Sequence, residues 1–326
     1  MELEVIHCPL CGVSDLRPYS ARLRFEAPHF LRVRCKGCGL IFANPRATKR
    51  ELDTFYQNYY DKGNFIGWKQ TTLAWRDSYV VTRPTKEIKR LMSYWCSLQG
   101  RRFPKGQALA ELGRGKRWLE VGAGLGKASH QALRMGFDVT VTELDFDAAD
   151  FLRTEMGIQQ IIMGELLDLD LPENYYDIVV IHHVLEHVLD PIATLQKICR
   201  LLTPGGIIFV GVPNLNTIGY HALRGVSFMR SRIPDIVDGI EHTFGFTPRT
   251  IRLCLQKSGF EVKRVRAMSK QVGLRFNPRS REDAVEQAKG LFENFFHVKM
   301  ECIAAKPIAK PVATPAATAV HTTRIG

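Results

Sequence analysis

The fold is decided by residues 118–127, which read Trp118-Leu119-Glu120-Val121-Gly122-Ala123-Gly124-Leu125-Gly126-Lys127. Residues 116–121 are predicted to form a short buried strand, and residues 127–135 a helix that ends at Gly136. The three alternate glycines between them permit positive φ angles and let a ligand lie directly against the backbone. The start of the helix adds unpaired N–H groups. This stretch therefore predicts a ligand-binding turn in an α/β sheet.

The spacing of the glycines distinguishes this turn from the dinucleotide-binding pattern G-x-G-x-x-G, which occupies the same place in related folds. Here the third glycine follows after one residue, and Lys127 stands where the dinucleotide pattern has Gly or Ala. Glu120 precedes the turn, and a carboxylate there suits a cationic ligand group better than a pyrophosphate. The stretch resembles motif I (E/D-x-G-x-G-x-G) of class I S-adenosylmethionine-dependent methyltransferases. That resemblance implies that Glu120 faces the methionine end of the cofactor.

A second acid follows the next predicted strand. Residues 137–143 alternate as a half-buried strand does and end at Glu143, 21 residues after Gly122. In doubly wound sheets an acid at this position accepts hydrogen bonds from ribose hydroxyls; the alternative is an ordinary surface glutamate. The resemblance also places Glu165 and Leu166 where the adenine is held, and His182 against the cofactor. The predicted cofactor-binding residues are Glu120, Gly122, Ala123, Gly124, Gly126, Glu143, Leu144, Glu165, Leu166 and His182.

Later motifs of the same family follow in the expected order. Residues 176–181 predict a buried parallel strand, Asp190-Pro191 the start of a helix, and Pro204-Gly205-Gly206 its end before a strand at 207–212. With motif I, these segments extend the resemblance over about residues 105–265. It implies an α/β fold: a doubly wound, seven-stranded Rossmann-like sheet of strand order 3-2-1-4-5-7-6, with an antiparallel last strand.

Histidines at the carboxyl end of strand 176–181 are the candidates for catalysis. S-adenosylmethionine brings an activated methyl group, so a base is needed only for a hydroxyl or an acidic carbon acceptor. A neutral imidazole suits proton removal near pH 7, which makes His183 and His187 the predicted catalytic residues. The alternative for His187 is that it braces the following helix.

The same histidines also allow a metal site. Ubiquinone-pathway O-methyltransferases and small-RNA terminal 2′-O-methyltransferases resemble this segment and carry a Glu-x-x-Glu-His pattern that binds a divalent ion. Here the pattern reads His183-x-x-Glu186-His187, with His242 as a further candidate ligand. The first position departs from glutamate, so base and metal ligand both remain open as roles for this cluster.

Four of the eight cysteines form two Cys-x2-Cys pairs, Cys8 with Cys11 and Cys35 with Cys38. Four thiolates at this spacing predict a structural zinc ribbon, whose closed ligand set leaves no position for water. Two reduced turns without metal are the alternative. The other cysteines (Cys96, Cys199, Cys254 and Cys302) lie in apolar segments and are predicted core residues.

Composition narrows the classes of partner and compartment. The chain carries 45 Lys and Arg against 33 Asp and Glu, a net charge of +12. This excess favours anionic partners such as nucleic acid, phosphorylated substrates or a membrane surface, although solubility alone also accounts for it. Basic residues concentrate at 17–50 and at 249–281. No signal peptide and no apolar run of the ~20 residues that cross a bilayer is found in the sequence, so a cytoplasmic location is expected.

The predicted domain organisation has four parts. Residues 1–47 form the zinc ribbon, 48–104 a helical linker or cap, 105–305 the methyltransferase domain, and 306–326 a disordered tail. The linker is expected to contain a short helix within residues 48–60 and a longer one at about 70–98. Within the methyltransferase domain, residues 215–246 form an insert where a substrate lid would sit, and residues 282–292 are expected to be helical.

These observations predict an S-adenosylmethionine-dependent methyltransferase that also holds a structural zinc ion. The expected acceptor is a small-molecule, glycan-linked or lipid-linked group, anionic and methylated chiefly at oxygen. One alternative is an RNA methyltransferase that uses the basic ribbon and residues 249–281. A second is a non-catalytic S-adenosylmethionine-binding partner protein. A dehydrogenase is disfavoured by Lys127 and Glu120.

Overall fold

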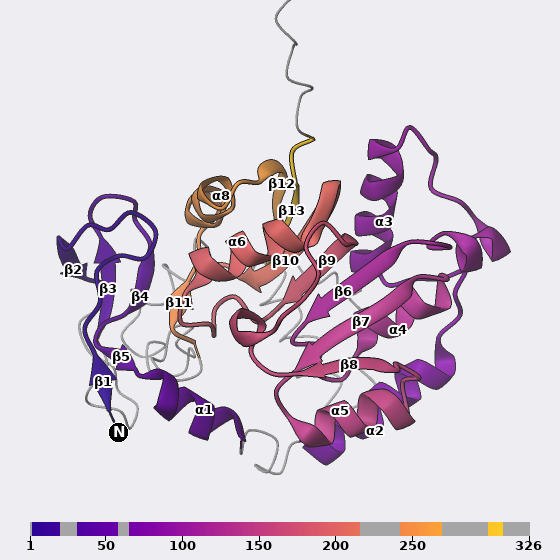
Figure 1. Ribbon diagram of the computed structural model, residues 1–326, viewed down its shortest axis with the longest axis horizontal. Coiled ribbons are helices and arrows are strands. Elements are labelled where there is room, and N and C mark those ends of the chain that lie inside the picture. Colours follow the sequence, from indigo (N-terminus) through magenta and orange to yellow (C-terminus); the bar gives the residue numbers. More distant parts are fainter. Residues whose placement is uncertain (1, 20–30, 58–64, 216–241, 269–298, 309–326) are drawn as a thin grey trace, which may run out of the picture.

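A seven-stranded mixed sheet forms the centre of the protein (Figure 1). The computed structural model describes residues 2–19, 31–57, 65–215, 242–268 and 299–308. The strands of the sheet are β6 (Arg117–Val121), β7 (Asp138–Glu143), β8 (Gln160–Met163), β9 (Tyr176–His182), β10 (Leu202–Pro213), β12 (Glu261–Met268) and β13 (Lys299–Ala305). Their spatial order is β12-β13-β10-β9-β6-β7-β8, and β13 runs antiparallel to both neighbours. The predicted strand order and antiparallel last strand are therefore confirmed.

Different helices cover the two faces of the sheet. Along β9, Ile178 and Val180 belong to one hydrophobic core, and Val179 and Ile181 to the other, as the period of two in a strand requires. The first core is closed by α3 (Lys86–Leu98), α4 (Lys127–Arg134) and α5 (Phe146–Thr154). The second is closed by α6 (Pro191–Leu201), α8 (Pro248–Lys257) and the N-terminal module. Burial on both faces explains why the central strands read as continuous apolar runs.

The N-terminal module shares a sheet with β11 (Phe244–Gly245), a short strand about 200 residues later in the chain. Its strands are β1 (Leu3–Glu4), β2 (Leu16–Pro18), β3 (Arg32–Cys35), β4 (Ile41–Ala43) and β5 (Arg46–Ala47). Strands β2, β3 and β4 form a four-stranded sheet with β11. Phe42 of β4 packs on Phe244 with ring centroids 6.2 Å apart. The module is thus joined to the central sheet through a common core (Figure 1).

The linker contains the short helix predicted within residues 48–60, but two helices in place of the single one predicted at about 70–98. It forms α1 (Lys49–Gln57), α2 (Phe65–Ser78) and then α3, which begins only at Lys86. Pro84 explains the break, because proline lacks an N–H and disfavours the helical conformation of the residue before it. Thr85 then caps α3 by accepting a hydrogen bond from the Ile88 N–H.

The start of the fifth strand was also predicted too late. Instead of beginning at Ile207, β10 begins at Leu202, and its pairing with β9 shifts register between these two residues. The Pro-Gly-Gly segment therefore lies within the strand's bounds as an irregularity. Two short 3-10 helices, η1 (Gly106–Glu111) and η2 (Leu166–Asp168), complete the described elements.

Several predictions concern residues outside the described part of the chain: residues 216–241 of the insert, the helix at 282–292, and residues 309–326 of the tail. In the segments that are described, every helix is too short or too polar to cross a bilayer.

Candidate cofactor and acceptor cavity

A cavity of about 500 Å³ lies at the carboxyl ends of β6, β7, β8 and β9. Doubly wound sheets bind ligands at this edge, and the volume lies in the usual range for small-molecule sites. The lining residues that were predicted as site residues are Gly122, Ala123, Gly124, Glu143, Leu144, Glu165, Leu166, His182, His183 and His187. Lining residues that were not predicted include Lys49, Asp53, Tyr56, Trp68, Thr142, Asp145 and Val184.

The turn after β6 has left-handed backbone at all three glycines, with φ of 63° at Gly122, 53° at Gly124 and 69° at Gly126. Glycine adopts these angles without steric cost. A Cβ at Gly122 would also lie 2.6 Å from Val184, so this glycine lets the loop after β9 approach the turn. Gly126 does not line the cavity, and a Cβ there would lie 2.3 Å from Leu152. Gly126 therefore allows close packing under α4, and its contact with the cofactor stays a prediction.

Glu120 is likewise placed behind the turn rather than in the cavity wall. Its side chain is buried, and Oε2 accepts hydrogen bonds from the backbone N–H of Ser129 at 2.9 Å and from the Ser129 hydroxyl. Burial raises the pKa of Glu120 to about 7, although both hydrogen bonds oppose this rise. Glu120 therefore ties β6 to the first turn of α4, and its position facing the methionine end of the cofactor stays a prediction.

Glu143 lies at the mouth of the glycine turn, as predicted. Its Oε2 accepts a hydrogen bond from the Gly124 N–H at 2.7 Å, and Oε1 accepts from the N–H groups of Leu144 at 2.8 Å and Asp145 at 3.2 Å. Burial raises the pKa of Glu143, while these three N–H groups lower it. A carboxylate offers about four acceptor positions. Three are used by the backbone, which leaves about one for a hydroxyl in the cavity.

Helix α1 is fastened to the loop after β8 by a lysine. Lys49 Nζ lies 2.7 Å from Glu165 Oε2, 3.4 Å from Asp168 Oδ2 and 3.5 Å from Asp53 Oδ1. The hydrogen bond with Glu165 raises the pKa of Lys49 above its ordinary range, so the amine stays charged. The cluster places α1 over the end of the cavity where the adenine is expected.

His183 has a backbone conformation that is uncommon outside glycine. Its φ is 55°, and its N–H donates to the Gly211 carbonyl at 2.9 Å. Non-glycine residues held in this region are often found at functional sites. The neighbouring His182 ends β9, and burial lowers its pKa to about 3, so its ring is neutral. Both rings line the cavity.

His183 is paired with a fully buried carboxylate. Its Nδ1 lies 3.0 Å from Oε1 of Glu186, whose side chain has no exposed surface. Burial raises the pKa of Glu186, but the hydrogen bond from His183 and the nearby charge of His187 outweigh it and leave the pKa below its ordinary value. An ionised carboxylate can only accept, so Nδ1 carries the hydrogen and Nε2 is left as an acceptor. Within the described residues, Glu186 Oε2 has no hydrogen-bond partner.

Glu186, His187 and His242 form a second polar group beside this pair. Their ligand atoms lie within 4.8 Å of one another. The ring centroids of His187 and His242 are 4.7 Å apart, and His187 Nδ1 lies 2.9 Å from the hydroxyl of Tyr56. Segments far apart in the chain therefore meet here: α1, the loop after β9, and the segment before β11.

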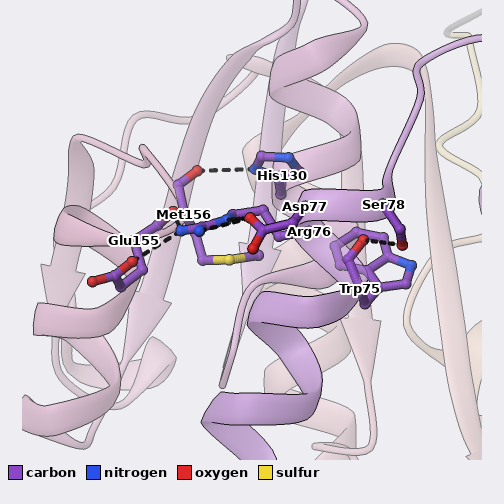
Figure 2. Close-up of polar contacts among 7 residues, drawn as sticks. All are labelled: Trp75, Arg76, Asp77, Ser78, His130, Glu155 and Met156. Carbon is purple, nitrogen blue, oxygen red and sulfur yellow. Dashed lines mark hydrogen bonds and ion pairs between the residues drawn. The ribbon is translucent and has the colours of Figure 1, made fainter.

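Helix α2 contributes Trp68 to the cavity wall. The C-terminal end of α2 is held by polar contacts to the residues that follow α5 (Figure 2). Arg76 Nη1 donates to the carbonyl of Glu155 at 2.8 Å and to its carboxylate at 2.9 Å. His130 Nδ1 lies 3.0 Å from the Met156 carbonyl, and its ring packs edge-on against Trp75. Burial lowers the pKa of His130, so it makes this contact uncharged.

The four predicted zinc ligands converge in the N-terminal module. The Sγ atoms of Cys8, Cys11, Cys35 and Cys38 all lie within 4.8 Å of one another, with separations of 3.5 Å between Cys8 and Cys38 and 3.4 Å between Cys11 and Cys35. In a tetrahedral site with Zn–S bonds of about 2.3 Å, sulfurs are roughly 3.8 Å apart. The donor set and its spacing therefore fit a structural zinc ion.

The strand order, the glycine turn and the acid at the end of the second strand are those that the resemblance to class I methyltransferases implies. Comparison with known proteins agrees: the chain belongs to a methyltransferase-domain family, whose pattern it matches over residues 94–265. It is an S-adenosylmethionine-dependent methyltransferase.

Individual relatives were found by sequence and by structure. The chain is 26% identical over 225 residues to a ubiquinone biosynthesis O-methyltransferase of Pseudomonas putida (strain GB-1), covering 67% of this chain and 88% of that protein. It is 31% identical over 128 residues to a protein of the same description from Alkalilimnicola ehrlichii, covering 37% and 51% of the two chains. Among solved structures, a SAM-dependent methyltransferase of Archaeoglobus fulgidus shows 21% identity and a TM-score of 0.42, covering 61% of this chain and 88% of that one.

Proposed function

We propose that the protein methylates a hydroxyl oxygen of a small molecule, with His183 as the base. The observation that carries this proposal is the pair formed by His183 and the buried Glu186 in the cavity wall. The curated relatives named above are O-methyltransferases, which supports oxygen as the accepting atom.

The cavity suits S-adenosylmethionine. When bound, this cofactor supplies a methyl group already activated on a sulfonium. The backbone at Gly122 and Gly124 would lie against it, and the remaining acceptor position of Glu143 would take a ribose hydroxyl. Glu165 and Leu166 would flank the adenine, and neutral His182 adds no charge that repels the sulfonium.

In this proposal, His183 removes the proton of the acceptor hydroxyl. Glu186 holds Nδ1–H, fixes the ring orientation and leaves Nε2 to accept the proton. As the ring gains positive charge, the ionised Glu186 stabilises it. His187 lies on the same cavity, where the Tyr56 hydroxyl orients its ring. This contact favours a positioning role for His187.

The group of Glu186, His187 and His242 also fits a divalent metal ion, since it offers one oxygen and two nitrogen donors around a buried oxygen that lacks a partner. A metal held there would neutralise the Glu186 carboxylate and draw an acceptor oxygen toward His183. A chelator that leaves the ribbon zinc in place distinguishes the two roles. If His183 acts as a base without a metal ion, activity should be unchanged after this treatment.

We further propose that the four cysteines hold a structural zinc ion, and that residues 1–47, 48–104 and 105–305 act as ribbon, cap and methyltransferase domain. The cysteine geometry and the position of α1 over the cavity support this division. An anionic acceptor is supported by the excess of basic residues. RNA methylation through residues 249–281 is the competing proposal, but residues 269–281 lie outside the described part.

The test is to incubate the protein with methyl-labelled S-adenosylmethionine and separated small-molecule, glycan and RNA fractions of a cell extract. Label is expected in the small-molecule fraction, in a product whose methyl group is attached to oxygen. The label should remain under conditions that hydrolyse esters, as expected for a methylated hydroxyl. Label confined to RNA would replace this proposal with the RNA alternative. Tight cofactor binding without any transfer would favour the non-catalytic partner protein.

A further inference from the structure

A second cavity, of about 330 Å³, lies between the N-terminal module and the start of α8. It shares no lining residue with the methyl-transfer cavity. Its lining residues are Arg17, Arg34, Cys35, Lys36, Gly37, Cys38, Gly39, Thr247, Arg249 and Thr250. Four of them are cationic and none is acidic.

Three of the four cations have no anionic partner in the described part of the chain: Arg17, Arg34 and Arg249 make no side-chain hydrogen bond or ion pair there. Lys36, by contrast, lies 2.9 Å from Asp15. Some arginines elsewhere in the described part are paired, such as Arg46 with Glu4 and Arg90 with Glu301, whereas others, such as Arg102, have no side-chain partner there. Arg17, Arg34 and Arg249 differ from those surface arginines because they line one cavity, and no acidic residue lines it with them.

The backbone adds to the positive potential. Thr247 caps α8 by accepting from the Thr250 N–H, and Pro248 has no N–H to offer. The Arg249 N–H is left without an acceptor among the described residues, and it lies at the positive end of the helix dipole. Beside Arg34, Gly39 has φ of 86°, and a Cβ there would lie 3.4 Å from the guanidinium, so the glycine leaves room next to it.

The zinc site does not account for this charge. A zinc ion with four thiolates carries two negative charges, and Cys35 and Cys38 line the cavity. The three unpaired guanidinium groups carry three positive charges, which exceed the two negative charges of the zinc site. Lys36 is left out of this comparison because Asp15 offsets its charge. One of them, Arg249, comes from α8 rather than from the ribbon.

We propose that this cavity binds the phosphate or diphosphate group of a small phosphorylated ligand. Guanidinium groups bind phosphate oxygens through pairs of charge-assisted hydrogen bonds, and arginines from two modules can approach such a group from both sides. The site is connected to the acceptor end of the first cavity by a short segment, from His242 through β11 to Thr247. A phosphorylated ligand bound here would bridge the ribbon and the methyltransferase sheet.

The experiment titrates inorganic phosphate and pyrophosphate into the full-length, zinc-loaded protein by calorimetry, without methyl donor or acceptor. The double variant Arg34→Gln/Arg249→Gln is compared with Arg102→Gln, an exposed arginine outside the cavity. Pyrophosphate affinity should fall by at least about tenfold in the double variant, since a hydrogen bond to a charged group contributes about 1.5 kcal/mol or more. The control should bind as the parent does, and the zinc content should be unchanged in all three proteins.

Two further arms identify the source of the phosphate. Competition between pyrophosphate and a phosphorylated acceptor assigns the site to the acceptor, whereas binding without competition assigns it to a separate ligand; both outcomes support the proposal. The proposal is overturned if phosphate and pyrophosphate do not bind at millimolar concentration, or if Arg102→Gln weakens pyrophosphate binding as much as the double variant does. It is also overturned if the double variant loses zinc but keeps its affinity for pyrophosphate. A third contrary result is binding of an RNA oligonucleotide that requires Arg34 and Arg249 while pyrophosphate binding does not. Because binding is measured without methyl transfer, these results are independent of the proposed function.

Discussion

The proposed cofactor end and the proposed acceptor end of the first cavity are built in different ways. The cofactor end comes from consecutive strands and turns, between Gly122 and Leu166, and its key carboxylate, Glu143, is held by three backbone N–H groups. The acceptor end combines Tyr56 of α1, His183 after β9 and His242 before β11, and its carboxylate, Glu186, has one oxygen without a described partner. The cofactor end is thus fixed by local structure, whereas the acceptor end depends on how distant segments are assembled.

His183→Ala is expected to give the largest difference between the effect on catalysis and the effect on cofactor binding. Loss of the base should lower kcat by about 10²–10⁴-fold, while the affinity for S-adenosylmethionine stays within a few-fold of the parent, because Glu143 and the glycine turn are untouched. Steady-state kinetics and calorimetry measure both quantities. His7→Ala, at an exposed histidine, is the control. An unchanged kcat would remove His183 from the chemistry.

Zinc removal tests the dependence of the acceptor end on the N-terminal module. Cys11→Ser, which removes one of the four proposed zinc ligands, should release zinc and displace α1 and its Tyr56. A displacement of about 1 Å near the reacting groups can cost roughly 100-fold in rate, so a loss of that size is expected. Cofactor affinity should fall by a smaller factor, because Lys49 of the same helix contacts Glu165. Cys199→Ser, outside the cluster, should keep both zinc and activity. If cofactor affinity falls in parallel with activity, the two ends are not separable in this way.

The buried Glu120 gives the cofactor end a pH dependence of its own. Its pKa of about 7 in the folded protein exceeds its ordinary value of 4.5, so the folded state favours the protonated acid. The contribution of Glu120 to the free energy of unfolding is fully present below pH 4.5 and is lost as the pH rises through 7. The total loss is roughly 3 kcal/mol. Glu120→Gln should therefore exceed the parent in stability at pH 8 and match it at pH 4.5. Denaturant unfolding at both values measures this, and a pH-independent difference would contradict it.

The same contrast explains what the sequence could predict. The glycine turn, Glu143 and the strand order were predictable because each depends on a local pattern and on a topology with few alternatives. Glu120 and Gly126 share that pattern, but no spacing rule contains the hydrogen bond of Glu120 with Ser129 or the close approach of Gly126 to Leu152. Lys49 and Trp68 were missed because α1 and α2 reach the cavity only through tertiary packing. The pairing of β11 with β4 joins residues about 200 positions apart and has no local signal.

A smaller effect, on binding alone, is expected from Glu143→Gln. The amide keeps the size of the side chain but loses the charge that orders the three N–H donors and accepts a ribose hydroxyl. The dissociation constant for S-adenosylmethionine should rise by about tenfold, the value of one charged hydrogen bond, with kcat at saturation nearly unchanged. Asp150→Asn, on the exposed face of α5, is the matched control. A fall in kcat without a change in affinity would mean that Glu143 acts in catalysis and not in cofactor binding.

The smallest effect is expected where a helix contacts the cofactor end from outside. Arg76 joins α2 to Glu155 (Figure 2), but both side chains are partly exposed, so the ion pair contributes only about 0.2–1 kcal/mol. Trp75 still packs against His130 in Arg76→Ala, and α2 should keep its place most of the time. The KM for S-adenosylmethionine should therefore rise less than about fivefold, with kcat unchanged and with Arg83→Ala as control. A large change in kcat would mean that α2 also orders the acceptor end, and that the two ends are coupled through this helix.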